Sequence, residues 1–484
     1  MCSPGPNLVI SASAHWIALT AQCLAALPPP PGARYGRAMP PPVILQAPWR
    51  DPVAVLGTVA DRPWTLGFLS GGEDAEWSYV LADPEAVLSL AGDDPRDPFE
   101  ALRALAGPAR ETDQEGPPFQ GGVAGLAAYD LGDRVEPVGL QRLGSWPDLA
   151  CARYTRLLAF DHRGRRVQAL GADEADAGEA LKWLAATLPD PDFPGTHLDP
   201  DDVYAYEAAV AGVVRRIRDG ELFQANIARR WRGRLEPGTR PFDLMAGLAA
   251  TSPAPFAAYL RLPDRAVVSN SPERFLQVRR DERGLLAVTQ PIKGTAPRGA
   301  TPEADRVLAD GLLASEKDRA ENLMIVDLMR NDLSRVCVAG EVRTPQLFRV
   351  ASFANVHHLV STVTGRLSPG RDAVDLLRAA FPPGSITGAP KVQAMRVIAE
   401  LEAPRGPFFG AMFQLGFDGG FDSSVLIRTA AFVEDEAGWA VEARAGAGIV
   451  ADSDPAAERA ETEAKISALL AALSRCSAGP PPPR

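Results

Sequence analysis

Lys293 is the residue whose type and setting most strongly indicate chemistry in this chain. It lies in the run Gln290-Pro-Ile-Lys-Gly-Thr295, and only five of the 50 lysine and arginine residues are lysines. A position that needs only a solvated positive charge is nearly always arginine in this sequence. Lysine differs because its ammonium group can lose its proton when desolvated and then act as a nucleophile or base. Lys293 is therefore a candidate catalytic residue; the ordinary alternative is a turn lysine that faces water.

Two expected helices carry carboxylates three residues apart, namely Asp318 with Glu321 and Glu458 with Glu461. Residues at i and i+3 share one helix face. If the two faces meet, their oxygen atoms suit Mg²⁺, and the absence of nearby His or Cys disfavours zinc and iron. The alternative is ordinary charge on solvated helices. Lys465 follows Glu461 by four residues, so it could pair with that glutamate or bind an acidic group of a substrate.

Glycine-containing segments supply possible anion-binding sites. Gly294 follows Lys293, Gly446 and Gly448 alternate with alanine, and residues 383–391 form a proline- and glycine-rich loop before a helical pattern. Glycine lets backbone N–H groups approach an anion, and a helix N-terminus adds a favourable dipole. None of these segments has the spacing of a Walker phosphate loop. Taken alone, each is more often a tight turn than a binding site.

Two adjacent histidines, His357 and His358, lie in a segment that we expect to be a strand. Successive side chains of a strand point to opposite faces. At most one of the two can therefore face a given cleft, and the other is expected to be structural.

Hydrophobic patterning predicts the elements that position these residues. Helical spacing or a run of strong helix formers predicts helices over residues 203–219, 315–329, 392–401 and 455–474. Short or alternating apolar runs predict strands over residues 64–69, 77–81, 222–231, 255–262 and 266–269.

A cluster of proline and aspartate at residues 187–201 indicates a boundary between two regions. We expect an N-terminal α/β region at residues 45–190, packed on a catalytic domain at residues 202–474. Proline-rich sequence predicts a disordered extension at residues 1–44 and a disordered tail at residues 475–484. Met1 and Met39 are both possible natural starts.

Composition excludes several classes of function. The net charge of −11 and the pI near 5.2 argue against nucleic acid as a partner, which basic patches normally bind. Five scattered cysteines without CxxC spacing suggest neither a disulfide framework nor a zinc site. The apolar residues 7–27 lack the preceding basic residues of a signal peptide. We therefore expect a cytoplasmic protein with no membrane partner.

Five blocks of the chain resemble, in the same order, the chorismate-utilising enzymes, and within them component I of aminodeoxychorismate synthase. They are Phe223-Gln-Ala-Asn226, Ser271-Pro-Glu-Arg-Phe275, Pro291-Ile-Lys-Gly-Thr295, Lys317 to Leu323 with Arg330-Asn-Asp332, and Gly446 to Asp454 followed by Glu458 to Lys465. The resemblance covers residues 202–473 and, more weakly, residues 121–131. It implies an α+β fold with a four-layer α/β/β/α core, in which two packed antiparallel sheets flank the site.

Lys293 distinguishes the two most similar subfamilies. Anthranilate synthases typically carry alanine in this loop, whereas aminodeoxychorismate synthases carry lysine. In the latter, the lysine attacks ring carbon C2 of chorismate as the C4 hydroxyl leaves, and ammonia then adds at C4. The resemblance thus implies 4-amino-4-deoxychorismate as the product, a precursor of p-aminobenzoate for folate. Anthranilate synthase component I and a non-catalytic chorismate-binding regulatory subunit are the alternatives.

The same resemblance implies roles for other residues. Glu273 matches the general acid that protonates the leaving hydroxyl, a role that a closed pocket supports by raising the pKa of the carboxyl. Gln224 occupies the position where isochorismate and salicylate synthases carry a water-activating lysine, which favours ammonia. The positions that match substrate contacts are Gln224, Gly294, Thr295, His358, Arg428, Gly446, Gly448 and Lys465. Mg²⁺ ligands are implied at Glu321 and Glu461, with Asp318 and Glu458 as outer-shell or water-mediated ligands.

One position departs from the family pattern, and one function is missing. Phe408 stands where many relatives have a tyrosine near the substrate carboxylate, so a hydroxyl hydrogen bond is expected to be lost. The chain has no Gly-x-Cys-x-Gly motif and no amidotransferase block. We therefore expect ammonia to come from a separate glutaminase subunit or from free ammonium. Aromatisation to p-aminobenzoate would need another protein.

Overall fold

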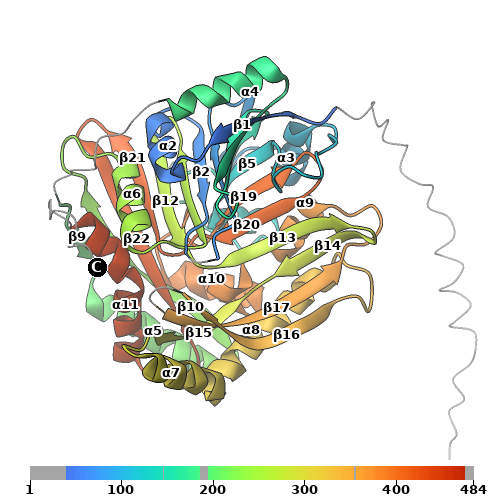
Figure 1. The fold of residues 1–484 in the computed structure, drawn as a ribbon. Coiled ribbons are helices and arrows are strands. Elements are labelled where there is room, and N and C mark those ends of the chain that lie inside the picture. The colour runs from blue at the N-terminus through green and yellow to red at the C-terminus, as the bar shows by residue number, and fades with distance from the viewer. Residues whose placement is uncertain (1–39, 73, 145, 186–194, 354–355, 475–484) are drawn as a thin grey trace, which may run out of the picture. The chain divides into compact units, whose positions relative to one another are not determined.

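The computed structural model describes residues 40–72, 74–144, 146–185, 195–353 and 356–474 (Figure 1). The expected tail at residues 475–484 and nearly all of the expected extension at residues 1–44 lie outside these ranges. Those two expectations are therefore not tested.

The larger sheet has 12 strands among the described residues, and its strand pairs are antiparallel. In spatial order the strands are β1 (Val43–Pro48), β8 (Arg166–Gly171), β7 (Leu157–Asp161), β3 (Trp77–Leu81), β2 (Thr65–Leu69), β11 (Phe256–Arg261), β12 (Arg265–Ser271), β21 (Thr429–Asp435), β22 (Gly438–Ile449), β10 (Gln224–Arg234) and β18 (Gly388–Ala389), with β9 (Leu198–Pro200) paired to β10.

The smaller sheet has 10 strands within the described ranges and is also antiparallel. In spatial order these are β15 (Ile292–Pro297), β17 (Val356–Arg366), β14 (Gly284–Thr289), β13 (Arg274–Asp281), β20 (Phe421–Val425), β19 (Ala411–Gly416), β5 (Gly122–Ala127), β6 (Leu149–Tyr154) and β4 (Ala86–Leu90), with β16 (Arg343–Ser352) paired to β17.

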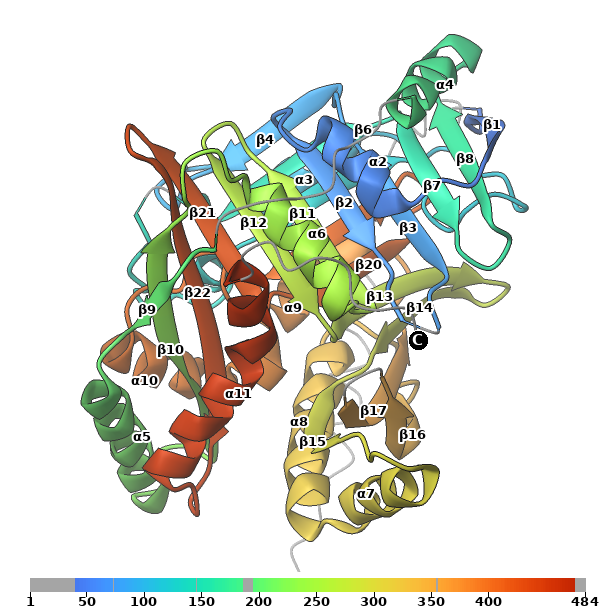
Figure 2. The same cartoon turned by 60° about the vertical axis from the view of Figure 1, so that its left-hand side comes forward.

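Helices cover the outer faces of the two sheets. The α-helices are α2 (Pro52–Val59), α3 (Pro98–Ala106), α4 (Glu174–Leu181), α5 (Val203–Arg218), α6 (Pro241–Thr251), α7 (Pro302–Ala314), α8 (Glu316–Ser334), α9 (Ala373–Ala380), α10 (Lys391–Leu401) and α11 (Pro455–Leu473), and short 3₁₀ turns are η1 (Tyr129–Arg134), η2 (Lys182–Leu184) and η3 (Gly384–Ile386). Figure 2 shows α6 and α11 over β12 and β22, and α8 beside β15 and β17.

The main hydrophobic core includes residues of both sheets and of the helices α3, α8 and α9. Leu66 and Leu81 of the larger sheet and Val123 and Phe413 of the smaller sheet are all inaccessible to solvent and belong to it. Val80, between two core residues on β3, belongs instead to a second cluster with α2, α6 and α11, because alternate residues of a strand face opposite ways. The arrangement of helices, sheet, sheet and helices confirms the expected α+β, four-layer α/β/β/α class.

Strands from both expected sequence regions pair within both sheets. In the larger sheet β2 pairs with β11, and in the smaller sheet β5 pairs with β19. The two regions at residues 45–190 and 202–474 therefore share their hydrogen-bond ladders as well as their core.

The four expected helices are confirmed as α5, α8, α10 and α11, of which α8 and α11 carry candidate site residues. Both of these site helices begin at side-chain caps. Ser315 accepts a hydrogen bond from the Asp318 N–H at the start of α8, and Asp454 accepts one from the Ala457 N–H at the start of α11. The expected strands are confirmed as β2, β3, β10, β11 and β12. In the described part of the chain, we find no helix with the length and apolar character needed to cross a membrane.

Candidate active site

A cavity of about 490 Å³ is lined by β10 and β22 of the larger sheet, β15 and β17 of the smaller sheet, and the helices α8 and α11. The lining contains every residue assigned to the site from the sequence except Gln224: Lys293, Glu273, Gly294, Thr295, His358, Arg428, Gly446, Gly448, Lys465, Asp318, Glu321, Glu458 and Glu461. Segments more than 100 residues apart in the sequence thus converge on one cavity.

The direction of the Lys293 side chain is set by an irregularity in the pairing of the smaller sheet. Strand β15 pairs with β17 at Ile292 with Val360 and again at Thr295 with His358, so the register shifts between these pairs. Such a bulge changes the direction of the side chains within it. Gly294 has a φ of 96°, which glycine adopts without the strain that a side chain would cause.

The Lys293 ammonium is partly shielded and paired. Its Nζ lies 3.0 Å from Oε2 of Glu321, and only 18% of the lysine side chain is exposed. A Cβ atom at Gly448 would lie 2.7 Å from this Nζ and 2.9 Å from Nε2 of Gln224. The missing side chain at Gly448 therefore leaves room for both groups. Gln224 lies next to this end of the cavity, and both polar atoms of its buried amide lack a hydrogen-bond partner among the described residues.

Glu273 is placed as a neutral acid. It is 5% exposed, and its carboxyl accepts hydrogen bonds from the Ser385 hydroxyl at 2.8 Å and from the Ile292 N–H. Burial raises the pKa of Glu273 to about 7, against the lowering effect of these hydrogen bonds and of Lys293 and Lys465. A large fraction of this carboxyl is therefore protonated near neutral pH.

The two histidines face opposite ways, as expected for a strand. His358 lines the cavity, and its Nδ1 lies 2.9 Å from the Thr295 hydroxyl. Burial, reinforced by the charge of Arg428, lowers the pKa of His358 to about 3, so the imidazole is neutral. His357 instead has its Nε2 2.9 Å from Asp305 on α7.

Two further cations, Arg428 and Lys465, line the cavity. Arg428 has a φ of 51°, a backbone conformation that is uncommon outside glycine and often occurs at functional sites. Burial lowers the pKa of the Arg428 guanidinium, an effect that the charge of Glu273 offsets in part. Lys465 donates to the Gly446 carbonyl at 2.8 Å and lies 2.6 Å from Glu461. The ion pair expected as one alternative for Lys465 is thus present, and the lysine still faces the cavity.

The four expected metal ligands meet in this cavity from two helices, Asp318 and Glu321 on α8 and Glu458 and Glu461 on α11. Burial raises the pKa of Glu458, with Glu461 adding to the effect, whereas Lys465 holds the pKa of Glu461 down against its burial. Within the described residues, no three potential ligands are already grouped closely enough to hold a metal ion.

The donor set nevertheless fits a hard divalent cation. Carboxylate oxygens are the ligands that Mg²⁺ prefers, and the lining residues of α8 and α11 include no histidine or cysteine. Glu321 and Glu461 are each paired with a lysine, and the Ser453 hydroxyl donates to Glu458 at 2.6 Å. A bound cation would take the place of these lysine contacts.

Phe408, where the loss of a tyrosine hydroxyl near the substrate is expected, does not line the cavity. The Phe408 side chain is 1% exposed. The guanidinium carbon of Arg444, which does line the cavity, lies 5.0 Å from the centre of the Phe408 ring. The neighbouring Phe409 lines the cavity instead, from a backbone with a φ of 64°. A left-handed residue at this point turns the second aromatic ring inward, which sequence alone does not reveal.

Several other lining residues were not singled out from the sequence. They are Asn226, Ser385, Ile386, Phe409, Ile427 and Arg444. Ser385 belongs to the glycine-rich loop at residues 383–391 that was noted as a possible anion-binding segment, and Asn226 belongs to the block that contains Gln224. For these two, a local signal existed but did not indicate a role.

Comparison with known proteins places this site in a family. A profile described as chorismate binding enzyme matches residues 67–471. The chain belongs to this family of chorismate-binding enzymes. Component 1 of aminodeoxychorismate synthase from Salmonella typhimurium is 38% identical over 457 residues, which cover 89% of this chain and 98% of that protein.

Other chorismate-binding enzymes are similar to nearly the same degree. Anthranilate synthase component 1 of Haloferax volcanii is 37% identical over 499 residues, covering 89% of this chain and 92% of that protein. The crystal structure of anthranilate synthase component I from Streptococcus pneumoniae matches with a TM-score of 0.73 at 28% identity, over 83% of this chain and 93% of that chain. Overall identity therefore establishes the family and the fold, and the choice between reactions rests on the site.

Proposed function

We propose that this chain joins ammonia to chorismate to form 4-amino-4-deoxychorismate, with Lys293 as the covalent catalyst. The observation that carries the proposal is the position of Lys293, whose Nζ occupies the cavity that also contains the buried acid Glu273. Only a lysine at this position can form and then break a carbon–nitrogen bond, because guanidinium is not nucleophilic and alanine has no nitrogen.

In the first half of the proposed reaction, the Lys293 ammonium loses a proton to solvent, and its Nζ then forms a bond to ring carbon C2. The ring double bonds shift as the C4–O bond breaks, and Glu273 donates its proton to the departing hydroxyl, which leaves as water. The lysine nitrogen then releases one proton. Hydroxide is a poor leaving group, so the reaction needs an acid that is still protonated near neutral pH, and burial of Glu273 supports that role.

In the second half, ammonia forms a bond to C4 while the bond between C2 and Lys293 breaks and the double bonds shift back. One proton of the new C4 ammonium goes to the departing lysine nitrogen. Lys293 and Glu273 then each take up a proton and return to their starting states. The balance is one chorismate and one ammonia converted to one 4-amino-4-deoxychorismate and one water. The uncharged amide of Gln224 next to Lys293 supports ammonia over water as the nucleophile, since an amide cannot act as a base for water.

Substrate binding follows from the charges of the cavity. Chorismate carries two carboxylates, and we assign one of them to Arg428 and the hydroxyl of Thr295, beside the neutral His358. The second carboxylate is assigned to the end where Lys465 and the glycine backbone of β22 lie. Burial strengthens these contacts because the cavity walls exclude water.

We assign Mg²⁺ to Glu321 and Glu461, with Asp318 and Glu458 around them. The cation, when bound, neutralises a substrate carboxylate among four negative side chains. Without this neutralisation the acidic walls would repel the dianionic substrate. The residues of the chain then hold and orient chorismate between Lys293 and Glu273.

Ammonia is assigned to a separate glutaminase subunit or to free ammonium. The relatives are themselves named as components, which supports a partner subunit. Further conversion to p-aminobenzoate for folate is assigned to another enzyme.

The test is product identification. The purified chain is incubated with chorismate, Mg²⁺ and ammonium, and the products are separated and identified by mass spectrometry. We expect 4-amino-4-deoxychorismate as the main product. Anthranilate with pyruvate as the main products would overturn the proposal and favour the reaction of the anthranilate synthase relatives.

A further inference from the structure

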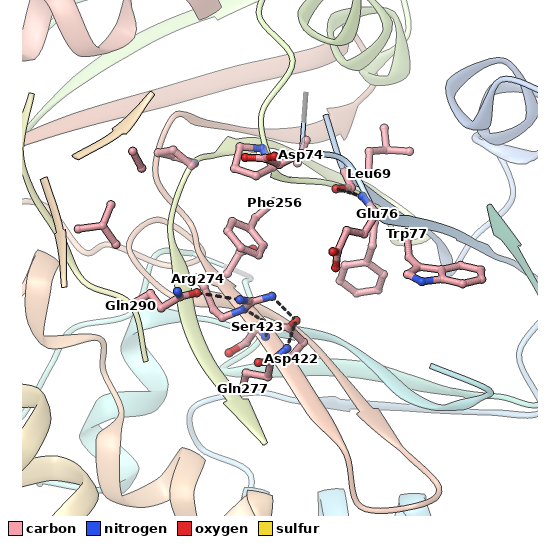
Figure 3. Close-up of a pocket in the computed structure, with 18 of the residues that line it drawn as sticks. Leu69, Asp74, Glu76, Trp77, Phe256, Arg274, Gln277, Gln290, Asp422 and Ser423 are labelled. Atoms are coloured by element: carbon pink, nitrogen blue, oxygen red, sulfur yellow. Dashed lines mark hydrogen bonds and ion pairs between the residues drawn. The ribbon is translucent and has the colours of Figure 1, made fainter. Parts of the chain in front are cut away.

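A second cavity, of about 600 Å³, lies next to the candidate active site, and Pro272 and Ile292 line both cavities. Figure 3 shows Arg274 in this second cavity, with its guanidinium linked to Asp422 and Gln290. Arg274 directly follows Glu273 in the sequence. The wall between the cavities therefore presents the acid on one side and this arginine on the other, as expected for consecutive residues in extended backbone.

The Arg274 side chain is fixed by several contacts. Its Nε and Nη2 each donate to a carboxylate oxygen of Asp422 at 3.0 Å, and its Nη1 donates to the side-chain carbonyl of Gln290 at 2.8 Å. The guanidinium carbon also lies 4.8 Å from the ring centre of Phe256. Paired bonds from a planar guanidinium to one carboxylate restrict both distance and orientation. The side chain is 21% exposed, so it is shielded from solvent.

These contacts connect the two segments that carry the proposed catalytic residues. The regular ladder between β13 and β14 ends at Gln277 with Val288, before it reaches Arg274. Beyond that point, Gln290 is held by Arg274, and Ile292 donates its N–H to the Glu273 carboxylate. Lys293 is the next residue.

We propose that Arg274 is a positioning residue that fixes the segment of Lys293 relative to Glu273 through its bonds to Asp422 and Gln290. This inference rests on the proposed catalytic roles of Lys293 and Glu273. Arg274 itself lines the neighbouring cavity and not the active-site cavity. Its loss therefore alters the spacing of the proposed catalytic pair and leaves Arg428 and Lys465, the charged groups assigned to the substrate carboxylates, in place.

The first experiment compares Arg274→Ala and Gln290→Ala with the unmodified chain in steady-state assays of chorismate consumption. We expect kcat to fall about 10- to 100-fold for Arg274→Ala, because a misplacement near 1 Å costs up to about 100-fold in rate. For Gln290→Ala, which keeps the pair between Arg274 and Asp422, we expect a fall of about fivefold. KM for chorismate should change much less than kcat in both variants, because Arg428 and Lys465, the charged groups assigned to the substrate carboxylates, lie on other segments.

Arg163→Ala is the matched control. Arg163 lines the same cavity, but its ion pair with Glu76 is exposed, with 69% and 62% of the two side chains accessible. We expect an unchanged kcat for this variant, since exposed ion pairs contribute little. Thermal unfolding of each variant measures the fraction of folded protein to which the rates are normalised.

Chemical rescue separates positioning from a general structural effect. Millimolar guanidinium is added to the Arg274→Ala variant, with sodium chloride at equal ionic strength as the control. The cavity beside Arg274 is large enough to admit this small cation, so we expect guanidinium alone to restore kcat by about fivefold or more. Protein that has merely lost stability would not regain kcat in a denaturing cation.

A wild-type kcat in Gln290→Ala would overturn the proposal, and this variant decides the matter even if Arg274→Ala fails to fold. An equal loss in Arg163→Ala, or a loss in Arg274→Ala that guanidinium does not restore, would also overturn it. The proposed function is tested separately by the product of the unmodified chain. The ratio of each variant's rate of chorismate consumption to that of the unmodified chain tests the role of Arg274, whichever product is formed.

Discussion

At the scale of single residues, the cavity gives each proposed catalytic group different surroundings. Glu273 is enclosed and accepts bonds from a hydroxyl and a backbone N–H, so burial dominates and its pKa is raised. Lys293 keeps a carboxylate partner, Glu321, at 3.0 Å. Glu273 is therefore able to donate a proton. Lys293 is oriented by its ion pair with Glu321, in which a bound cation can take the place of the lysine.

Replacement of Lys293 tests its covalent role. We expect Lys293→Ala and Lys293→Arg to lose the chorismate adduct and to reduce product formation on the order of 10³-fold or more. Arginine keeps a positive charge next to Glu321 but cannot attack carbon. Intact-protein mass spectrometry without ammonia measures the adduct. Lys182→Ala, at an exposed lysine outside the cavity, is the control and should retain wild-type values; an adduct that persists in Lys293→Ala would contradict the mechanism.

The raised pKa of Glu273 predicts the pH dependence of the reaction. Glu273 must be protonated to act as the acid, so kcat/KM should fall as pH rises above about 7. The measurement is the pH profile of kcat/KM under saturating ammonia. A profile that stays flat from pH 6 to about 9 would be inconsistent with Glu273 as the acid.

The same group makes stability depend on pH with a defined sign. The pKa of Glu273 is higher in the folded chain than its ordinary value of 4.5, so its contribution to stability is fully present below pH 4.5 and is lost as pH rises through about 7. Glu273→Gln removes this loss. We compare the free energy of unfolding of the variant with that of the unmodified chain. As the pH rises from acidic values to pH 8, this difference should shift in favour of the variant by up to about 3 kcal/mol. Denaturant unfolding at several pH values measures this difference.

At the scale of elements, two helices and a bulged strand bring the site together. The i, i+3 spacing of carboxylates on α8 and α11 was sufficient to predict a shared helix face, and all four line the cavity. The bulge in β15 was not predictable, because it depends on the pairing of β15 with a strand more than 60 residues away. Phe409 and Ser385 were missed for a similar reason, since their direction depends on local backbone and not on residue type.

The convergence of α8 and α11 leads to a prediction about the metal. Glu461→Gln should abolish the dependence of activity on Mg²⁺ and lower activity at least about 100-fold, because a neutral amide is a poor ligand beside Lys465. Glu463→Gln is the matched control on the same helix. Glu463 forms ion pairs with Arg229 and Arg459 and does not line the cavity. Activity is titrated against Mg²⁺ after chelation. A wild-type chain that is fully active without any divalent cation would contradict the assignment.

At the scale of the whole molecule, the order of strands explains which parts of the fold sequence reasoning could anticipate. Local patterns predicted individual helices and strands, such as α5, β2 and β3, because burial repeats with the period of each element. The pairing of β2 with β11 and of β5 with β19 joins residues separated by more than 180 positions. No local pattern encodes such partners, so the extent to which the two sequence regions share their sheets had to come from the structure.

This shared architecture predicts that the catalytic region does not fold alone. A fragment of residues 195–474 would leave the edges of β11 and β19 unpaired and would expose core residues such as Leu260 and Phe413, which are inaccessible in the full chain. Unpaired edges and exposed apolar surface favour aggregation. We expect this fragment to be insoluble or to lack a cooperative unfolding transition, as measured by gel filtration and circular dichroism.

Coexpression with a fragment of residues 40–185 is the control, because it supplies β2, β5 and the missing part of the core. We expect the two fragments to copurify and to regain a cooperative transition. Since every residue that lines the candidate active-site cavity belongs to the larger fragment, the complementing fragment contributes none of them. Restoration of activity would then show that the smaller region supports catalysis through the shared sheets alone, whereas a soluble and active larger fragment would show that its strands need no partners from residues 40–185.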